Sequence, residues 1–323
     1  MKLDVITFGS ATRDIFLKPK KVSLLKYDAS AREGVCFPLG SKIDIEELYF
    51  TTGGGGTNSA ATFANQGFKT AYCGAIGADQ AGKDIMAELQ TLKIANFVAW
   101  KKEKATNHSV IITNSGHDRT ILAYRGASEL LDYRDIPWSK LKAAWFYIAP
   151  LTGLLAENFH KLVSVAKKNN IKVAVNPSIA QLSLPNFIHI AQKVDVLILN
   201  QEEASFLTKI SFEREQEIFQ KIDELCPGIA IMTKGEEGVV VSDGKHLYSA
   251  KPHKEPNIQD TTGAGDAFGS GFVAEFMRSS DIGKAIQFAM ANSTGCISEM
   301  GAKNGLLKKG QKFERVEVIK EEI

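Results

Sequence analysis

The sequence predicts an α/β protein built on a mostly parallel β-sheet that is covered by helices on both faces. Short apolar runs rich in β-forming residues alternate along the chain with stretches whose apolar residues recur at helical spacing. The runs are apolar throughout, which is typical of strands buried on both faces, and their alternation with helices indicates a layered architecture. The predicted strands are residues 3–8, 70–76, 143–148, 172–175, 194–199 and 229–233.

The helical spacing is clearest between the third and fourth of these strands. Leu155, Phe159, Leu162 and Ala166 recur so that they fall on one side of a helix. This apolar stripe predicts a crossover helix that packs against the sheet.

Two stretches interrupt the alternation of strands and helices, residues 12–50 and 100–124. Within the second stretch, residues 109–113 and 120–124 are predicted strands on either side of a turn at Asn114-Ser115-Gly116. We expect the two stretches to form a small β-sheet lid that covers a cleft.

Composition and charge limit the organisation and the partners of the chain. Hydrophobic residues make up 44% and charged residues 24%, with a net charge of +2 and basic residues interleaved with acidic ones, so neither a nucleic-acid nor a membrane partner is expected. The chain has no internal repeat or proline-rich linker, so we expect one domain over residues 1–323 with the lid inserted.

The cysteines and the N-terminus predict a cytoplasmic protein. The four cysteines lie far apart with no C-x-x-C pair, which is typical of buried reduced thiols. The first residues resemble a strand rather than an export signal, and the apolar runs are far shorter than a membrane span.

The run at residues 260–266, Asp-Thr-Thr-Gly-Ala-Gly-Asp, directly precedes apolar residues at helical spacing, so its glycines lie at a helix N-terminus. Unpaired backbone amides and the positive end of the helix dipole favour an anion there, and glycines leave it room. We infer that Gly263, Ala264 and Gly265 form an anion hole for charge that develops on a phosphate. Asp266, in the first turn, is placed to act as a general base on an acceptor hydroxyl.

An isolated Gly-x-Gly-Asp would more simply be a turn followed by a helix-start carboxylate. Here the residues around it, including Gly269, Ser270 and Gly271 inside the helix, are unfavourable for a plain helix and a plain turn. Phosphoryl transfer explains the whole run.

The run at residues 260–266 resembles the C-terminal signature of the ribokinase-like, or PfkB, family of sugar and nucleoside kinases, and the resemblance extends over nearly the whole chain. It implies a three-layer Rossmann-like sandwich with a small β-sheet lid, and an ATP-dependent phosphotransferase with an alcohol group as acceptor. In this family the aspartate that matches Asp266 is the catalytic base, and the Gly-Ala-Gly before it forms the anion hole.

A second glycine-rich run, residues 53–58, precedes a row of small residues at a predicted helix start, where a backbone can approach a ligand closely. The run does not match the G-x-G-x-x-G fingerprint of dinucleotide-binding proteins, because Asn58 stands where the third glycine is required. The resemblance makes Gly54, Gly55 and Asn58 contacts to the acceptor, and it makes Asp14 the acceptor-binding aspartate. The alternatives are a flexible loop tip and a solvated loop acid.

Residues 77–83 match the G-x-x-x-x-G-K pattern of a Walker loop between a predicted strand and helix. The next residue is Asp84 rather than Ser or Thr, and Asp79 would repel phosphates, so we interpret the segment as a structural turn.

A nucleotide hydrolase centred on Lys83 is one alternative function. A non-catalytic sugar- or nucleotide-binding regulatory protein of the same fold is another.

Asn200 and Glu203 follow the predicted strand at 194–199, at the edge of the sheet where α/β folds bind ligands. The resemblance places Asn200 near the phosphates of ATP and makes Glu203 a partner of the water shell around Mg²⁺. The two residues also have the spacing of a helix capping box, and both roles can hold.

The resemblance places Thr233, Lys234 and Gly235, together with Gly265, along the nucleotide, although a hairpin turn alone explains the first three nearly as well. Asn292 matches a region that flanks adenine. A core-facing position on its helix is the equal alternative.

The resemblance also implies a monovalent cation such as K⁺, held by oxygens of Asp260, Thr262, Ser298 and Gly301. Lid strands with an exposed apolar face often pair between subunits, so a homodimer through the lid is expected.

The acceptor itself is less well defined than the reaction. Ribokinases usually have an asparagine where this chain has Thr12, a lysine at Gly55 or Gly56, and a glutamate near Ala149. These differences leave a small sugar or nucleoside as the expected substrate without selecting ribose. Arg119 could pair with an acidic sugar or with Asp118.

Overall fold

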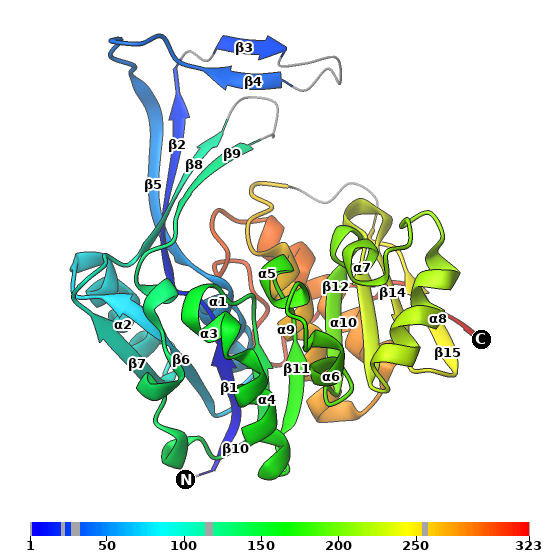
Figure 1. Ribbon diagram of the computed structural model, residues 1–323. Coiled ribbons are helices and arrows are strands. Elements are labelled where there is room, and N and C mark those ends of the chain that lie inside the picture. The colour runs from blue at the N-terminus through cyan, green and yellow to red at the C-terminus, as the bar shows by residue number, and fades with distance from the viewer. Residues whose placement is uncertain (1, 21–22, 27–32, 114–118, 254–257, 323) are drawn as a thin grey trace.

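The computed structural model describes residues 2–20, 23–26, 33–113, 119–253 and 258–322. Figure 1 shows a layered α/β body from which an arm of strands extends at one end. Within the described residues the body contains a ten-stranded sheet in the order β16-β15-β14-β13-β12-β11-β10-β1-β6-β7. All neighbours from β13 to β7 pair in parallel, and β14, β15 and β16 are antiparallel, so the predicted mostly parallel sheet is confirmed.

The six predicted strands are all present in this sheet. The largest difference is at β12, which begins two residues later than predicted because the Val194 amide donates to the Ala191 carbonyl in a turn. The strands are β1 (Leu3–Phe8), β6 (Thr70–Gly77), β7 (Ala95–Lys101), β10 (Ala143–Ile148), β11 (Lys172–Val175), β12 (Val196–Asn200), β13 (Ile229–Thr233), β14 (Val239–Ser242), β15 (His246–Ala250) and β16 (Ile319–Glu322).

Helices cover both faces of the sheet, as predicted (Figure 1). One face is packed by α1 (Gly55–Asn65), α2 (Gln80–Thr91), α9 (Ala264–Ser279) and α10 (Ile282–Ile297). The other face is packed by α3 (Gly153–Glu157), α4 (Phe159–Lys168), α5 (Ile179–Leu182), α6 (Phe187–Ala191), α7 (Gln201–Thr208) and α8 (Glu215–Leu225). Short 3₁₀ turns are η1 (Ala127–Leu130), η2 (Tyr133–Asp135), η3 (Trp138–Lys140) and η4 (Gly235–Glu237).

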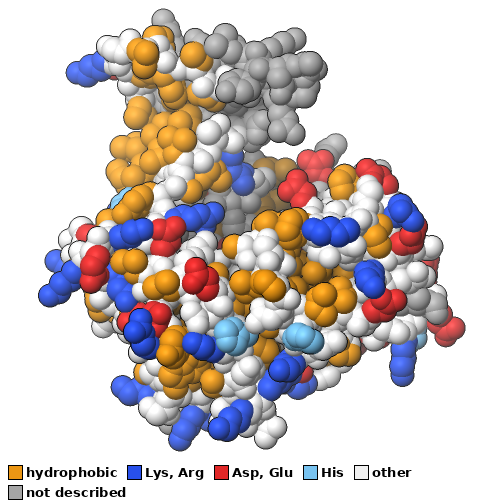
Figure 2. Space-filling model, viewed as in Figure 1, with side chains coloured by type: hydrophobic (Ala, Val, Ile, Leu, Met, Phe, Trp, Pro, Cys, Tyr) orange, Lys and Arg blue, Asp and Glu red, His pale blue; other side chains and the backbone are white. Residues whose placement is uncertain are grey.

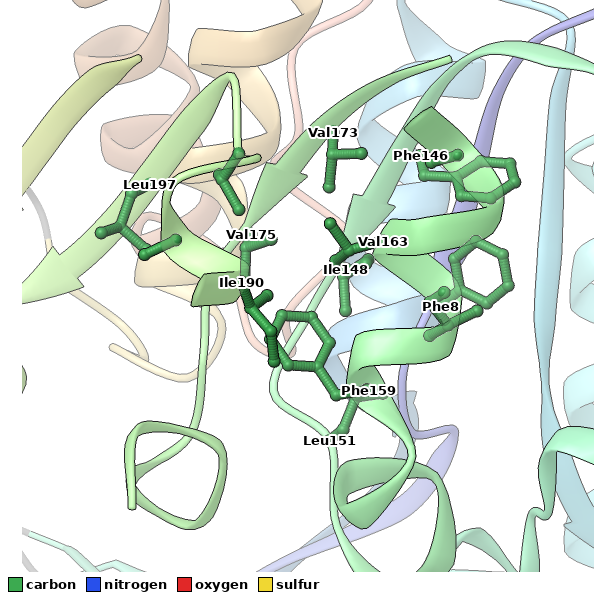
Figure 3. Packing of buried hydrophobic residues seen from close by; sticks show 14 of the residues in the cluster. Phe8, Phe146, Ile148, Leu151, Phe159, Val163, Val173, Val175, Ile190 and Leu197 are labelled. Atoms are coloured by element: carbon green, nitrogen blue, oxygen red, sulfur yellow. The ribbon is translucent and has the colours of Figure 1, made fainter. Parts of the chain in front are cut away.

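The predicted crossover helix is divided into two. Asn158 leaves the helical conformation, with φ −98° and ψ 13°, and separates α3 from α4. The predicted apolar stripe is nevertheless buried on both pieces, and Figure 3 shows Phe159 and its neighbours packed against β1, β10 and β11. In the same cluster the rings of Phe8 and Phe146 lie edge to face, 4.9 Å apart.

The lid is a four-stranded sheet in the order β5-β2-β8-β9. Its strands are β2 (Thr12–Pro19), β5 (Ile45–Gly53), β8 (Asn107–Thr113) and β9 (Arg119–Tyr124), and β3 (Ser23–Lys26) pairs with β4 (Glu33–Cys36) at the far end of the arm (Figure 1). The predicted lid boundary at residue 100 is wrong, because Trp100 lies in β7 and pairs with β6 of the body. The predicted turn at Asn114-Ser115-Gly116 lies outside the described residues.

Three of the cysteines, Cys73, Cys226 and Cys296, are buried and free, and Cys36 is free and partly exposed. In the described part of the chain, every helix is too short or too polar to cross a membrane.

Candidate active site

A pocket of about 240 Å³ lies where β11, β12 and β13 end and α9 begins. Parallel strands present their carboxyl ends at one edge of the sheet, so the polar residues that follow separate strands meet there. The pocket brings together residues that are far apart in the sequence, and most of them were predicted site residues. Its lining is Asn176, Ile198, Asn200, Glu203, Thr233, Thr261, Gly263, Ala264, Gly265 and Asp266.

The glycine run forms the N-terminus of α9 as predicted. Gly263 is the N-cap and has the left-handed conformation, with φ 81° and ψ 1°. A Cβ atom at Gly263 would lie 2.4 Å from the Cβ of Ala302, whereas one at Gly265 would meet no atom within 4 Å. Gly263 is therefore required by the fold, and Gly265 faces open space in the pocket. The first amides of a helix lack intrahelical acceptors, and here the Ala264 amide donates to the Thr261 carbonyl just before α9, at 3.4 Å.

Asp266 lies in the first turn of α9 and is held by the other glycine-rich helix. Its Oδ2 accepts a hydrogen bond of 2.9 Å from Nδ2 of Asn58, on α1. Loss of solvent around the carboxylate raises its pKa, and the Asn58 bond and the charge of Lys303 oppose that rise. A raised pKa makes the carboxylate a better proton acceptor at neutral pH.

The glycines predicted to contact the acceptor lie directly beside Asp266. Gly54 is the N-cap of α1 with φ 96°, and a Cβ there would lie 2.6 Å from the Ser10 carbonyl oxygen. A Cβ at Gly55 would lie 3.1 Å from Oδ1 of Asp266, so the backbone of Gly55 adjoins the proposed base. The structure thus brings Gly54, Gly55, Asn58 and Asp266 into one place.

Asp14 lies on β2 at the base of the lid, with 4% of its surface exposed. Burial raises its pKa to about 6, and a hydrogen bond with Ser109 of β8 and the charge of Lys303 oppose the rise. A Cβ at Gly53 would lie 2.0 Å from Oδ2 of Asp14, so only glycine fits beside this carboxylate. A buried, hydrogen-bonded carboxylate under a lid is suited to accept hydrogen bonds from hydroxyls of a ligand.

Asn200 and Glu203 form the capping box that their spacing predicts. Oδ1 of Asn200 accepts from the Glu203 amide at 2.8 Å, and Oε2 of Glu203 accepts from the Asn200 amide at 2.9 Å. Both residues also line the pocket, and burial raises the pKa of Glu203. Carboxylate and amide oxygens are suitable partners for Mg²⁺ and its water shell. Among the described residues no three His, Cys, Asp or Glu side chains gather to hold a metal by themselves.

The predicted nucleotide-binding residues at the end of β13 and just after it separate into two groups. Thr233 lines the pocket, but Nζ of Lys234 is 2.7 Å from Glu215 on α8, so its side chain is engaged there. Gly235 has φ 57°, and a Cβ atom added there would meet no atom within 4 Å. The Lys234 amide donates to the Gly238 carbonyl at 2.8 Å, which also makes this segment the turn between β13 and β14.

Asn292 does not reach the pocket. It is completely buried, and its Nδ2 donates to the Ala267 carbonyl at 2.8 Å while its Oδ1 accepts from the Leu307 amide at 2.9 Å. These contacts join α10 to α9 and to the following loop. The prediction that its side chain binds ATP is therefore corrected to a core-facing position on α10.

The residues predicted to hold a monovalent cation converge where α10 ends. The carboxylate of Asp260 accepts from the amides of Thr262 at 2.9 Å and Gly301 at 3.1 Å, and Asp260 donates its own amide to Ile297, next to Ser298. Nη1 of Arg119, on β9, lies 3.9 Å from Oδ1 of Asp260. The alternative partner, Asp118, lies outside the described residues.

The Walker-like segment is a structural turn, as interpreted. Asp79 is the N-cap of α2, and its carboxylate accepts from the amides of Gly82 and Thr106, both at 2.8 Å. These amides are thus already bonded to a carboxylate. Lys83 is exposed and lines none of the pockets described here.

Several residues of the site were not predicted from the sequence, among them Asn176, Gly53 and Lys303. Asn176 directly follows a predicted strand, which is the signal that identified Asn200, so it could have been found. Gly53 was predicted only as part of a glycine-rich run, and its position beside the Asp14 carboxylate was not foreseen. Lys303 lies in an irregular loop, and no local pattern there indicates that it approaches both Asp14 and Asp266.

The chain is similar to several known proteins. A family model described as pfkB family carbohydrate kinase matches residues 20–309. A ribokinase of Haemophilus influenzae is 25% identical over 293 residues, covering 86% of this chain and 91% of the relative. An adenosine kinase of Saccharomyces cerevisiae is 26% identical over 277 residues, covering 80% of this chain and 81% of the relative.

The fold is shared with solved structures. The structure of Arabidopsis thaliana ribokinase complexed with ribose and ATP superimposes with a TM-score of 0.76 at 22% identity, covering 95% of this chain and 96% of that chain. The likeness at this identity shows the fold.

Proposed function

The chain belongs to the pfkB family of carbohydrate kinases, and from that premise we propose that it transfers the γ-phosphate of ATP to a hydroxyl of a small sugar or nucleoside, with Asp266 as the general base. The single observation that best supports this assignment is the 2.9 Å hydrogen bond between Asn58 and Asp266. It joins the helix start beside the predicted acceptor residues to the helix start that faces the pocket. Asp266 therefore lies between the two proposed substrates.

The pocket at the start of α9 is the proposed nucleotide half of the site. The amides of Gly263, Ala264 and Gly265 would stabilise negative charge on the transferred phosphoryl group, since they are oriented before the reaction begins. When bound, Mg²⁺ would neutralise charge on the phosphates. Asn200 and Glu203 line the same pocket and are the proposed partners of the phosphates and of the Mg²⁺ water shell.

The base of the lid is the proposed acceptor half. Asp14 would accept hydrogen bonds from acceptor hydroxyls, and the backbones of Gly54 and Gly55 let the acceptor approach Asp266 closely. Asp266 would take the proton from the attacking hydroxyl, while its bond to Asn58 fixes the direction of the carboxylate. During transfer the γ-phosphate oxygens would lie against the amides of the anion hole, and ADP would then leave from the pocket.

We propose K⁺ as a further ligand near the anion hole, at Asp260, Thr262, Ser298 and Gly301. The fit is supported by the convergence of these residues and by Oγ1 of Thr262, a buried oxygen with no hydrogen-bond partner in the described part of the chain. Comparing ADP release in K⁺ with that in choline salts tests the proposal.

We also propose that residues 1–323 act as one domain with an inserted lid, and that the lid pairs with that of a second copy. Large hydrophobic side chains are exposed on the lid, and Figure 2 shows hydrophobic side chains gathered along the arm. They are Ile45, Leu48, Tyr49 and Phe50 on β5 and Ile121, Leu122 and Tyr124 on β9. A dimer would bury this surface. Sedimentation of the wild type and of Phe50→Asp should show a dimer that the substitution weakens.

Coupled ADP release on a panel of acceptors tests the proposed function. The panel is ribose, deoxyribose, fructose, keto-deoxygluconate, adenosine and cytidine, because the relatives include both sugar and nucleoside kinases. ADP release that depends on one of these acceptors supports the proposal. ATP binding without ADP release on any acceptor would favour a regulatory binding protein. Acceptor-independent release that is lost in Lys83→Ala would favour a nucleotide hydrolase.

A further inference from the structure

Three side chains from separate segments form a closed cluster at the base of the lid. Nζ of Lys303 lies 2.6 Å from Oε2 of Glu88 on α2 and 2.9 Å from Oγ1 of Thr52 on β5. Oγ1 of Thr52 in turn donates to Oε2 of Glu88 at 2.5 Å. We call these three residues the lid clamp. The clamp ties a lid strand to the body and to the loop that follows α10.

The side chain of Lys303 is only 7% exposed, less than that of any other ion-paired lysine among the described residues. Burying an ammonium group is unfavourable unless it is paired and hydrogen-bonded, and even then such a pair contributes little net stability compared with apolar packing. The position of Lys303 is therefore better explained by what it holds in place than by the stability that it adds.

The loop that contains Lys303 is fitted between the lid and the anion hole. A Cβ at Gly301 would lie 2.9 Å from Cγ2 of Thr51, and one at Gly263 would lie 2.4 Å from the Cβ of Ala302. On the lid, Thr51 is the register partner of Asp14. Residues 301–303 thus contact the lid strand beside Asp14 on one side and the first residue of the anion hole on the other.

The ammonium group also lies within electrostatic range of the two functional carboxylates. Its positive charge lowers the pKa of both Asp14 and Asp266, opposing the effect of burial on each. It acts on both carboxylates from outside the pocket that we assign to ATP, because Lys303 does not line that pocket. It lines instead a separate cavity of about 220 Å³ at the foot of the lid, with Thr51, Thr52 and Glu88.

We propose, on the basis of the kinase function proposed above, that Lys303 is a positioning residue for the acceptor. Through the lid clamp it holds the base of β5, and with it Asp14 on the adjacent β2, at a fixed place relative to Asp266. Lys303 thereby sets the affinity for the acceptor and leaves the affinity for ATP unchanged.

The central test is Lys303→Met, which keeps the length of the side chain and removes its charge. With the acceptor identified from the panel, the KM for that acceptor should rise about tenfold, as expected for the loss of a charge-assisted contact, while the KM for ATP stays within about twofold. The matched control is Lys308→Met, an exposed lysine of the same loop region, which should change neither KM. If Lys303 only stabilised the fold, its replacement would change the KM for the acceptor and the KM for ATP alike.

A double-mutant cycle tests whether Lys303 acts through the clamp. Glu88→Gln alone should raise the acceptor KM, and the Lys303→Met/Glu88→Gln double variant should be no worse than Lys303→Met, because both changes remove the same interaction. Additive effects would overturn the clamp as the means of positioning.

Hydrogen exchange separates this inference from the proposed function, since it needs no acceptor. In Lys303→Met without substrates, peptides covering residues 12–19 and 45–53 should exchange faster than in the wild type, and those covering residues 143–148 in the central sheet should not. Faster exchange confined to the lid strands supports the clamp even if every acceptor in the panel fails. Unchanged exchange in the lid strands, or equal changes in both KM values, would overturn the proposal.

Discussion

The two halves of the site are built in different ways. The nucleotide half is assembled at the edge of the central sheet from residues that directly follow strands or begin a helix, and most of its lining comes from short continuous runs. The acceptor half joins a lid strand to a helix start and to a loop near the end of the chain, through Asp14, Asn58 and Lys303. Local sequence therefore predicts the proposed nucleotide half well, whereas the proposed acceptor half depends on contacts between distant segments.

The largest expected effect is on the residue where the two halves meet. Asp266→Asn should lower kcat at least about a thousandfold, because the amide cannot take the proton of the hydroxyl. Asp44→Asn, at an exposed position, is the matched control and should retain normal turnover. Coupled ADP release measures both. Near-normal turnover in Asp266→Asn would mean that another group is the base.

A pair of glycine substitutions separates folding from phosphate binding in the nucleotide half. Gly265→Ala places a methyl group in open pocket space, so kcat/KM for ATP should fall about a hundredfold with an unchanged melting temperature. Gly263→Ala must adopt φ 81° against Ala302, so it should also lose about 1–3 kcal/mol of stability. Thermal unfolding and initial rates on the two variants give the comparison. Equal melting temperatures for the two would contradict it.

The acceptor half should respond separately. Asp14→Asn should raise the KM for the acceptor about tenfold to a hundredfold, the range for loss of hydrogen bonds to a charged group, with the KM for ATP within about twofold. Steady-state kinetics with each substrate varied in turn measures this. If the ATP KM rose equally, Asp14 would not belong to the acceptor half alone.

The smallest expected effect is a dependence on pH. Burial raises the pKa of Asp14 from 3.8 to about 6, so acceptor affinity should weaken as the pH falls below that value, when the carboxylate is protonated.

The same raised pKa of Asp14 means that protonation of this carboxylate favours the folded state. Stability from this group is present below pH 3.8 and is lost as the pH rises through about 6. Asp14→Asn should therefore unfold at a higher temperature than the wild type at pH 7.5, and the difference should vanish near pH 4.

Sequence patterns predicted the central sheet and the start of α9 well because these depend on neighbouring residues. The strands are continuous apolar runs, and the glycine run directly before apolar residues at helical spacing marks where α9 begins. The patterns missed the break at Asn158, since the apolar stripe continues across it.

The remaining errors concern contacts between distant residues. Asn292 lies on the correct helix, but only its bonds to Ala267 and Leu307 show that it points into the core. Lys303 has no local signal at all, because its contacts are with Thr52 and Glu88 from two other segments. Trp100 was placed in the lid because residues 100–124 interrupt the alternation of strands and helices, yet it pairs with β6 of the body.

The central claim is that Asp266 takes a proton and does not hold either substrate. The most direct test is to measure the affinities of Asp266→Asn for ATP and for the acceptor by calorimetry, in a variant that cannot complete transfer. The account predicts that both dissociation constants stay within about threefold of the wild-type values, a change of less than 1 kcal/mol in either binding free energy. A loss of tenfold or more in either affinity would show that Asp266 is a binding group, and would contradict its assignment as the base.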